Sequence, residues 1–262
     1  MTLDSKVAFV TGAGSGIGAA TARLLAQRGA TVVAADIDRG SVEDVAQGIG
    51  ASGGSCVGVE LDVTDPVSVD RAVGHAGEAK GTVDVVAHCA GVVQVGSILE
   101  TPVEEYERVI AVNLGGTFNV CRAAIARMRD TGGGSIVVMG SMASLKGFAS
   151  FGAYCASKGG VLLLVKSLAL EWASSGIRVN AVCPGVIRTA MQKDILGAIY
   201  DRRPVDEREF DDLLQPQASS FQAIERAGTP EEVAEAVLYL ASDAATFVTG
   251  TALSIDGGAT AG

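Results

Sequence analysis

The stretch Thr11-Gly12-Ala13-Gly14-Ser15-Gly16-Ile17-Gly18 lies between an apolar run, Val7–Thr11, and a predicted helix, Ala19–Arg28. Glycines at such a turn let the backbone approach a pyrophosphate, and the helix N-terminus offers free N–H groups and a partial positive charge. A glycine-rich sequence alone could be no more than a tight turn. Because this one follows the first strand and opens a helix, it predicts a dinucleotide site. The residues expected to contact the cofactor here are Gly12, Ser15, Gly16, Ile17 and Gly18.

Six further short runs rich in β-branched residues follow along the chain: Thr31–Ala35, Ser55–Leu61, Val83–His88, Ser135–Met139, Arg178–Cys183 and Ala252–Ile255. Most are apolar throughout, which is typical of parallel strands buried on both faces. Helical patterns separate the runs. The alternation predicts an α/β fold, namely a doubly wound, Rossmann-like, mostly parallel seven-stranded sheet with helices on both faces.

Three of the predicted helices have recognisable starts. Asp65-Pro66 is one, and Thr101-Pro102-Val103-Glu104 and Thr229-Pro230-Glu231-Glu232 both read as capping boxes with proline at the first helical position. No linker divides the chain, so residues 1–262 are predicted to form a single NAD(P)-binding domain. Residues 188–226 depart from the strand–helix alternation, and loops of this length are usually functional or disordered. We interpret them as a helical lid over a substrate, with a solvated surface insertion as the alternative.

The composition restricts the class of protein. Of 262 residues, 48% are hydrophobic and 19% charged, which suits a compact core. A formal charge of −10 disfavours nucleic acids and anionic membranes as partners. No apolar run approaches the ~18 residues of a membrane span, and the N-terminus lacks a signal-peptide pattern. Five scattered cysteines predict reduced thiols and a cytoplasmic location, and with only His75 and His88 no metal site is expected.

Special residues gather where the predicted strands end, the edge at which open parallel sheets bind ligands. Asp36 ends the second strand, and a carboxylate there accepts hydrogen bonds from the adenosine ribose and repels a 2′-phosphate. NAD is therefore favoured over NADP, although the nearby Arg39 keeps NADP as an alternative. Asp62 and Val63 follow the third strand and are expected to border the adenine, with a turn role as the alternative for Asp62.

The other strand ends extend this series. Ala90-Gly91 follow the fourth strand, where small residues let the backbone pass close to the cofactor. Ser141 follows the fifth strand, and Pro184-Gly185 follow the sixth. Five successive strand ends with special residues predict one extended site.

Tyr154 and Lys158 are four residues apart, a spacing that places both on one face of a helix. A nearby cation lowers the pKa of a phenol from its usual ~10, so that the phenol can exchange protons near neutral pH. The spacing alone occurs by chance in many helices. Beside a dinucleotide site, it predicts oxidation of an alcohol or reduction of a ketone.

Together these motifs resemble those of the short-chain dehydrogenase/reductase family, in its short single-domain branch, from Lys6 to Gly258. The motifs are Thr11-Gly12-x-x-x-Gly16-x-Gly18, Asn113, Ser141, Tyr154-x-x-x-Lys158 and Pro184-Gly185-Val186-Ile187-Arg188-Thr189. The resemblance implies that Tyr154 is the general acid/base and that Lys158 lowers its pKa and binds the nicotinamide ribose. It implies that Ser141 orients the substrate oxygen and that Asn113 holds a water linking the lysine to solvent. Ile187 and Thr189 would contact the nicotinamide carboxamide.

One motif departs from the family pattern. The family usually has Asn-Asn-Ala-Gly after the fourth strand, and this chain has His88-Cys89-Ala90-Gly91. We expect His88 to take over a structural role from one asparagine, with catalysis as the less favoured alternative. Cys89 and Cys155 are expected to be packing residues.

These observations predict an oxidoreductase that transfers a hydride between NAD and a secondary alcohol or ketone, with a neutral cyclic or polyol-like substrate favoured. The alternatives are an NADPH-dependent 3-oxoacyl-carrier-protein-type reductase with the same catalytic residues and a non-catalytic NAD-binding regulatory protein. The expected partner is a small-molecule substrate. The family resemblance also implies a homo-oligomer, with a tetramer favoured over a dimer.

Overall fold

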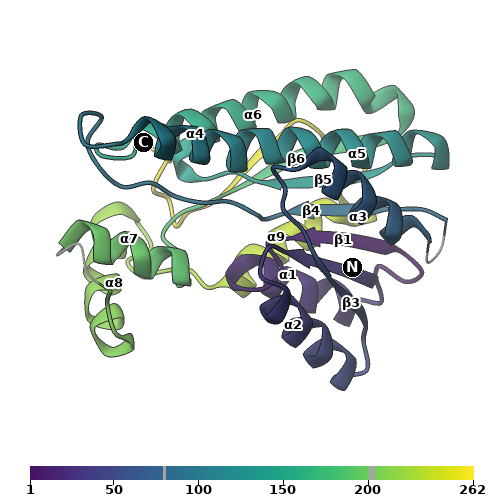
Figure 1. Ribbon diagram of the computed structural model, residues 1–262, viewed down its shortest axis with the longest axis horizontal. Coiled ribbons are helices and arrows are strands. Elements are labelled where there is room, and N and C mark those ends of the chain that lie inside the picture. The colour runs from purple at the N-terminus through teal and green to yellow at the C-terminus, as the bar shows by residue number, and fades with distance from the viewer. Residues whose placement is uncertain (79–80, 201–203) are drawn as a thin grey trace.

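Seven parallel strands form one sheet in the computed structural model, which describes residues 1–78, 81–200 and 204–262. The strand order is β3-β2-β1-β4-β5-β6-β7 (Figure 1). The strands are β1 (Val7–Thr11), β2 (Thr31–Asp36), β3 (Ser55–Glu60), β4 (Val85–His88), β5 (Gly134–Met139), β6 (Ile177–Pro184) and β7 (Ala252–Ile255). Every pair of neighbours is parallel, as expected from their continuous apolar character.

Helices cover both faces of the sheet, as Figure 1 shows. One face carries α1 (Gly16–Gln27), α2 (Arg39–Ala51) and α9 (Pro230–Ala241), and the other carries α3 (Pro66–Glu78), α4 (Val103–Ile110), α5 (Gly116–Thr131) and α6 (Gly152–Trp172). Alternate residues of each strand enter opposite cores. Phe9 and Val86 lie in the core under α3, α5 and α6, whereas Val10 and Ala87 lie in the core under α1 and α9. The predicted doubly wound fold is confirmed.

The chain reverses its direction of winding between β1 and β4. β1 pairs with β2 on one side and with β4 on the other, and Thr11 lies opposite His88. The connections that leave these two strand ends run to opposite faces of the sheet, and such a switch point opens a crevice. The glycine-rich turn after β1 therefore lies where the topology itself favours a ligand.

The helix starts bear out the sequence in two cases out of three. Thr229 caps α9 with a full capping box to Glu232, and the Asp65 carboxylate accepts a hydrogen bond from the Val67 N–H at the start of α3. The prediction for Thr101 is wrong. Helix α4 begins at Val103 after Pro102, and the Thr101 hydroxyl instead donates to the Ser97 carbonyl and accepts from Gln94. Hydrogen bonds to the segment just before Thr101 here replace the cap.

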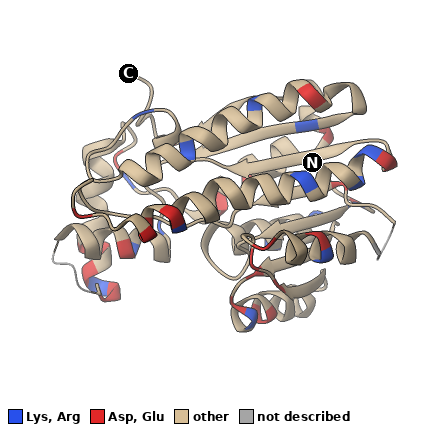
Figure 2. Ribbon diagram, turned by 45° about the horizontal axis from the view of Figure 1, so that its top comes forward, with Lys and Arg blue, Asp and Glu red and all other residues tan. Residues whose placement is uncertain are grey.

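Two helices follow β6, α7 (Ala190–Tyr200) and α8 (Glu207–Phe221), on one side of the sheet (Figure 1). They enclose a small core of their own, made by Val186, Leu196, Val205, Phe210, Leu214 and Ala218. Charged residues lie on their outer surfaces (Figure 2), where Arg188 pairs with Asp211 and Lys193 with Glu207. The segment is thus folded on itself at the carboxyl edge of the sheet.

Two helical stretches reach the length and apolar composition of a membrane span, although no uninterrupted apolar run does. They are Val103–Thr131 and Gly152–Ser175, with mean hydropathies of 1.4 and 1.3. Half of the first window and 39% of the second are buried inside the protein. Core helices of water-soluble proteins meet the same criterion, so this is weak support for a membrane.

Candidate active site

A cavity of about 830 Å³ follows the carboxyl ends of the strands. It is lined by every cofactor-contact residue predicted above and by Ser141, Tyr154 and Lys158. Asn113 is the one predicted site residue that does not line it. Asp36 and Ser141 follow β2 and β5, three strand positions apart, which corresponds to roughly 14 Å at the usual strand spacing. The predicted strand-end residues thus share one elongated cavity.

The glycine-rich turn packs too closely for side chains. A Cβ on Gly12 would lie 2.7 Å from the Ala90 nitrogen, and one on Gly18 would lie 2.0 Å from the Gly12 oxygen. Gly12 also has a φ of +64°, in the left-handed region. The turn therefore holds the N-terminus of α1 against the end of β4. The Ser15 side chain makes no capping hydrogen bond, and the first turn of α1 carries no acidic residue. The N–H groups at the start of α1 therefore favour an anion.

Acidic side chains stand at the ends of β2 and β3. The Asp36 carboxylate accepts hydrogen bonds from the Gly14 N–H (2.9 Å) and the Asp38 N–H (3.1 Å) and lines the cavity. Asp62 accepts from the backbone and hydroxyl of Thr64, so it takes the turn role while also lining the cavity. Beyond β6, Gly185 is packed against Asp256, and Ile187 and Thr189 line the cavity.

Ser141, Tyr154 and Lys158 come together at the ends of β5 and α6. The Ser141 side chain accepts a hydrogen bond from the Ala143 N–H and is hydrogen-bonded to Tyr154. Lys158 is buried and donates to the Met139 carbonyl oxygen at 2.8 Å, and its Nζ lies 5.9 Å from the centre of the Tyr154 ring. The sequence spacing thus places the three polar groups in one site.

Burial dominates the pKa values of this group. It raises the pKa of Tyr154, with the hydrogen bond from Ser141 acting in the opposite direction. It also lowers the pKa of Lys158 to about 8. The expected lowering of the Tyr154 pKa is therefore not seen in this geometry, because desolvation of the phenolate outweighs the hydrogen bond from Ser141 and the Lys158 ammonium lies against the ring.

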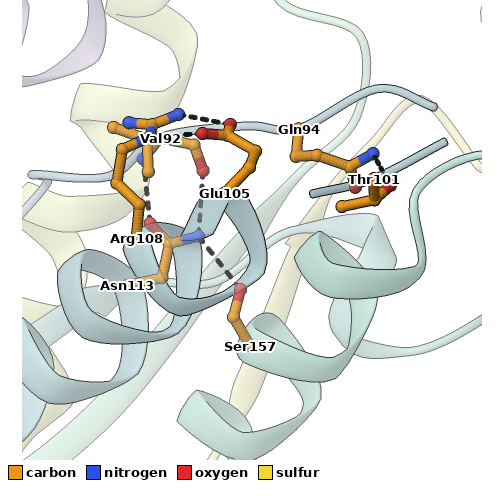
Figure 3. Close-up of polar contacts among 7 residues, drawn as sticks. All are labelled: Val92, Gln94, Thr101, Glu105, Arg108, Asn113 and Ser157. Atoms are coloured by element: carbon orange, nitrogen blue, oxygen red, sulfur yellow. Dashed lines mark hydrogen bonds and ion pairs between the residues drawn. The ribbon is translucent and has the colours of Figure 1, made fainter. Parts of the chain in front are cut away.

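Asn113 lies behind the cavity wall in a π-helical turn, Ala111–Gly115, between α4 and α5. Figure 3 shows its side chain between the Val92 backbone and Ser157. The amide accepts from the Val92 N–H at 2.8 Å and donates to the Val92 carbonyl (2.9 Å) and to Ser157 Oγ (3.0 Å). Ser157 in turn donates to the Tyr154 carbonyl. Asn113 thus ties the segment after β4 to the helix that carries Tyr154.

Sequence reasoning missed both partners of Asn113. Val92 contributes only backbone atoms, which leave no trace in a sequence motif. Ser157 lies within the Tyr154–Lys158 stretch, so its polar character was the one available signal.

His88 occupies the position where the family usually has asparagine, and it bridges two strand ends. Its Nδ1 lies 2.7 Å from the Thr11 hydroxyl, which also accepts a hydrogen bond from the Ala90 N–H. Burial, together with the Lys158 charge, lowers the pKa of His88 to about 3. The ring is therefore neutral, and its position supports the structural role expected for it.

The cysteines near the site are equally unreactive in character. Burial raises the pKa of Cys89 to about 12, and it raises the pKa of Cys183. No group of three or more His, Cys, Asp or Glu side chains within the described ranges could hold a metal ion.

The remaining wall of the cavity comes from α7, α8 and the segment before α6. It is mostly apolar, with an edge-to-face contact between Phe148 and Phe221 at 5.9 Å. Sequence reasoning found the apolar residues of the α7–α8 segment but not which of them face the cavity. These are Met191, Ile195, Ile199 and Phe221, joined by Gln192 and Gln217.

Comparison with known proteins gives a consistent set of relatives. A family model described as Enoyl-(Acyl carrier protein) reductase matches residues 12–260. Cis-4-hydroxycyclohexanecarboxylate dehydrogenase of Sinomonas cyclohexanicum is 42% identical over 98% of this chain and 97% of its own length. 2-(S)-hydroxypropyl-CoM dehydrogenase 3 of Xanthobacter autotrophicus is 37% identical over 99% and 98%. A short-chain type dehydrogenase/reductase from Mycobacterium marinum superposes with a TM-score of 0.88 at 34% identity, covering 100% of this chain and 98% of that one.

Proposed function

We propose that this chain, a member of the short-chain dehydrogenase/reductase family of oxidoreductases that act on hydroxyl groups, oxidises neutral secondary alcohols with NAD or reduces the corresponding ketones. Two of its relatives are dehydrogenases of secondary alcohols, one of them alicyclic. The proposal also treats residues 1–262 as one NAD-binding domain, with α7 and α8 as a lid over the substrate.

One observation carries the proposal: Ser141, Tyr154 and Lys158 line the same cavity as the glycine-rich turn and Asp36. The residues fit a dinucleotide along that cavity. The N–H groups at the start of α1 suit a pyrophosphate. Each Asp36 carboxylate oxygen accepts one hydrogen bond from a backbone N–H and can accept a further one from a ribose hydroxyl. Lys158 uses one of its three donors on Met139 and has others for the nicotinamide ribose.

The chain's own groups would handle the proton. NAD, when bound, supplies the hydride acceptor and a positive charge beside the phenol. In the oxidising direction, the Tyr154 phenolate takes the proton of the substrate hydroxyl while the C–H bond gives up its hydride. Ser141 donates a hydrogen bond to the oxygen that becomes the carbonyl. Bringing a tyrosine pKa from ~10 to ~7 requires about 4 kcal/mol, to which Ser141, Lys158 and the positive charge of bound NAD would each contribute.

Asn113 holds the segment beside Lys158 in place. Its hydrogen bonds to Val92 and Ser157 fix the turn that faces Lys158, and its side-chain oxygen lies 3.2 Å from where a Cβ on Gly91 would stand. We assign it to the relay that connects the lysine with water, as in the family.

Two observations support NAD over NADP. The Asp36 carboxylate ends β2 and lines the cavity, a position expected to repel a 2′-phosphate, and the opposing candidate, Arg39, is turned to Glu43 with an Nε–Oε1 distance of 2.7 Å. Like charges at a shared site repel, so the phosphate would be disfavoured.

The experiment is a steady-state panel of secondary alcohols and ketones with NAD(H) and NADP(H). We expect kcat/KM at least ~10-fold higher with NAD, and a loss of most of that preference in Asp36→Ser, since ~1.4 kcal/mol corresponds to tenfold. Equal or better turnover with NADP would contradict the cofactor assignment. Reduction of 3-oxoacyl thioesters with NADPH in preference to any simple ketone would support the carrier-protein-type alternative.

We also propose that the protein is cytoplasmic and assembles as a homo-oligomer, most often a tetramer. The cysteines are free thiols, which fits a reducing compartment. Along α5 and α6, Phe118, Leu163 and Leu170 expose 53%, 68% and 86% of their surface, and α6 carries few charges (Figure 2). Such an apolar face suits burial against a second copy.

A further inference from the structure

Two glutamines meet across the cavity wall between the lid helices. Gln192 on α7 donates through Nε2 to Gln217 Oε1 on α8 at 2.5 Å. Gln192 is 8% exposed, and both side chains line the cavity that holds Tyr154. They are the only amide side chains among the described residues that line it.

The pair has hydrogen-bonding capacity left over. Each amide offers two N–H donors and a carbonyl oxygen, and the contact between them uses one donor and one acceptor. Within the described residues no further hydrogen bond engages Gln192 Oε1 or Gln217 Nε2. Exchanging the oxygen and nitrogen of both amides leaves the same inventory, so the conclusion does not depend on their orientation. The pair thus keeps one amino group and one carbonyl oxygen outside their mutual contact, available to a ligand in the cavity.

The helices that carry the pair contribute mainly apolar side chains to the cavity lining. These include Met191 and Ile195 on α7 and Phe221 on α8, and the segment before α6 adds Met142 and Phe148. Among the described lining residues the only cations are Lys158 and Arg108, and both nitrogens that Arg108 turns to Glu105 lie within 2.8 Å of its carboxylate (Figure 3). An anionic substrate group would therefore lose its hydration without gaining a cation, which is costly.

We infer that Gln192 and Gln217 form a subsite for a second, uncharged oxygen of the substrate, so that the substrate class is a diol or hydroxyketone on an apolar carbon skeleton. This inference rests on the proposed function. A substrate hydroxyl at the subsite would donate to the free amide oxygen and accept from the free N–H. A site built to hydrogen-bond a hydroxyl discriminates against the analogue that lacks it, because its own polar groups are then left without partners.

The test compares cyclohexanol with the 1,2-, 1,3- and 1,4-cyclohexanediols and with 4-hydroxycyclohexanecarboxylate, using NAD. We expect kcat/KM for at least one diol to exceed that for cyclohexanol by ~10-fold or more, and the carboxylate to be the poorest of the set. Using three isomers covers the spacing between the reacting carbon and the subsite.

Variants separate a substrate contact from a mere tie between helices. Gln192→Leu and Gln217→Leu should each reduce the diol-to-cyclohexanol ratio to about 1–2. Gln217→Glu retains an acceptor for the Gln192 N–H, and hence the tie, but removes the donor to the cavity, so it should lower the ratio as well. Gln215→Leu is the matched control on the same helix, because Gln215 is exposed, bonds to the Glu225 carbonyl and does not line the cavity.

The outcomes are distinguishable. Turnover of cyclohexanol without preference for any diol, or preference for the carboxylate, would overturn the subsite and leave the proposed function standing. A wild-type diol preference that persists in Gln217→Glu would reduce the pair to a structural tie. No turnover of any alcohol or ketone with either cofactor would overturn the proposed function and the subsite together.

Discussion

The two halves of the cavity are built from different materials. The nucleotide half, made by β1, α1, β2 and residues 88–91, is shaped by backbone, and added Cβ atoms on Gly12 and Gly18 would strike backbone atoms within 2.7 Å. The substrate half, made by residues 142–154, α7 and α8, is shaped by side chains. Gly147, an exposed residue beside this half that does not itself line the cavity, has nothing within 4 Å of an added Cβ. A backbone-built wall tolerates few sequences, whereas a side-chain-built wall can change its ligand by substitution.

The sharpest contrast comes from adding one methyl group to each half. Gly18→Ala should cost about 3 kcal/mol or more in combined stability and NADH affinity, because α1 must move away from the Gly12 carbonyl. Gly147→Ala should change neither by more than about 0.5 kcal/mol. Urea unfolding and NADH fluorescence titration measure both effects. Equal effects of the two substitutions would remove the distinction between the halves.

His88 tests whether the nucleotide half depends on a neutral ring. Its folded pKa of about 3 lies below the usual value of 6.5, so the unfolded chain binds the proton more readily. The contribution to stability is complete above pH 6.5 and is lost as the pH falls toward 3. At pH 4 the loss is about 3 kcal/mol. Between pH 7 and pH 4 the unfolding free energy of His88→Asn should therefore fall by about 3 kcal/mol less than that of the wild type. The same fall in both proteins would show that His88 is not desolvated.

Lys158 lies where the two halves meet, and its substitution tests what burial of its charge costs in stability. Its pKa of about 8 means that the charged form is destabilised by burial, so Lys158→Met should raise the unfolding free energy at pH 7 by about 2 kcal/mol, after a lost hydrogen bond to Met139 is subtracted. The gain should shrink as the pH rises from 8 to 10.5, because the wild-type lysine then loses its proton in the folded state first.

Unfolding at pH 7 and pH 10, without added cofactor, measures this difference. The variant should have little or no dehydrogenase activity. A destabilised Lys158→Met protein at pH 7 would mean that the ammonium is well solvated or paired.

The difference between the two halves also explains which features of the fold and site could be predicted from the sequence. The five inner strands were predictable because strands buried on both faces are apolar throughout, and the glycine turn was predictable because only glycine fits there. Tyr154 and Lys158 were found by their spacing together with the neighbouring dinucleotide motif. The direction of the Tyr154 pKa was not predicted, because desolvation depends on residues distant in sequence. The false cap at Thr101 has a local origin, since Gln94 and Ser97 engage its hydroxyl.

The substrate half was largely unpredictable. Gln192 and Gln217 are 25 residues apart, on two helices whose packing brings them together, and neither lies in a motif. Which apolar residues of α7 and α8 face the cavity depends on the small core beneath them. Sequence patterns identify such helices but not the direction in which their side chains point.

The proposed mechanism depends most on Tyr154 as the group that exchanges the substrate proton. The direct measurement is kcat/KM for the preferred secondary alcohol with NAD, in wild type and Tyr154→Phe, alongside the NADH dissociation constant of each. We expect the variant to bind NADH within a few-fold of wild type and to lose about 1,000-fold or more in kcat/KM, the scale of general acid–base catalysis. Turnover by Tyr154→Phe within tenfold of wild type would contradict the assignment.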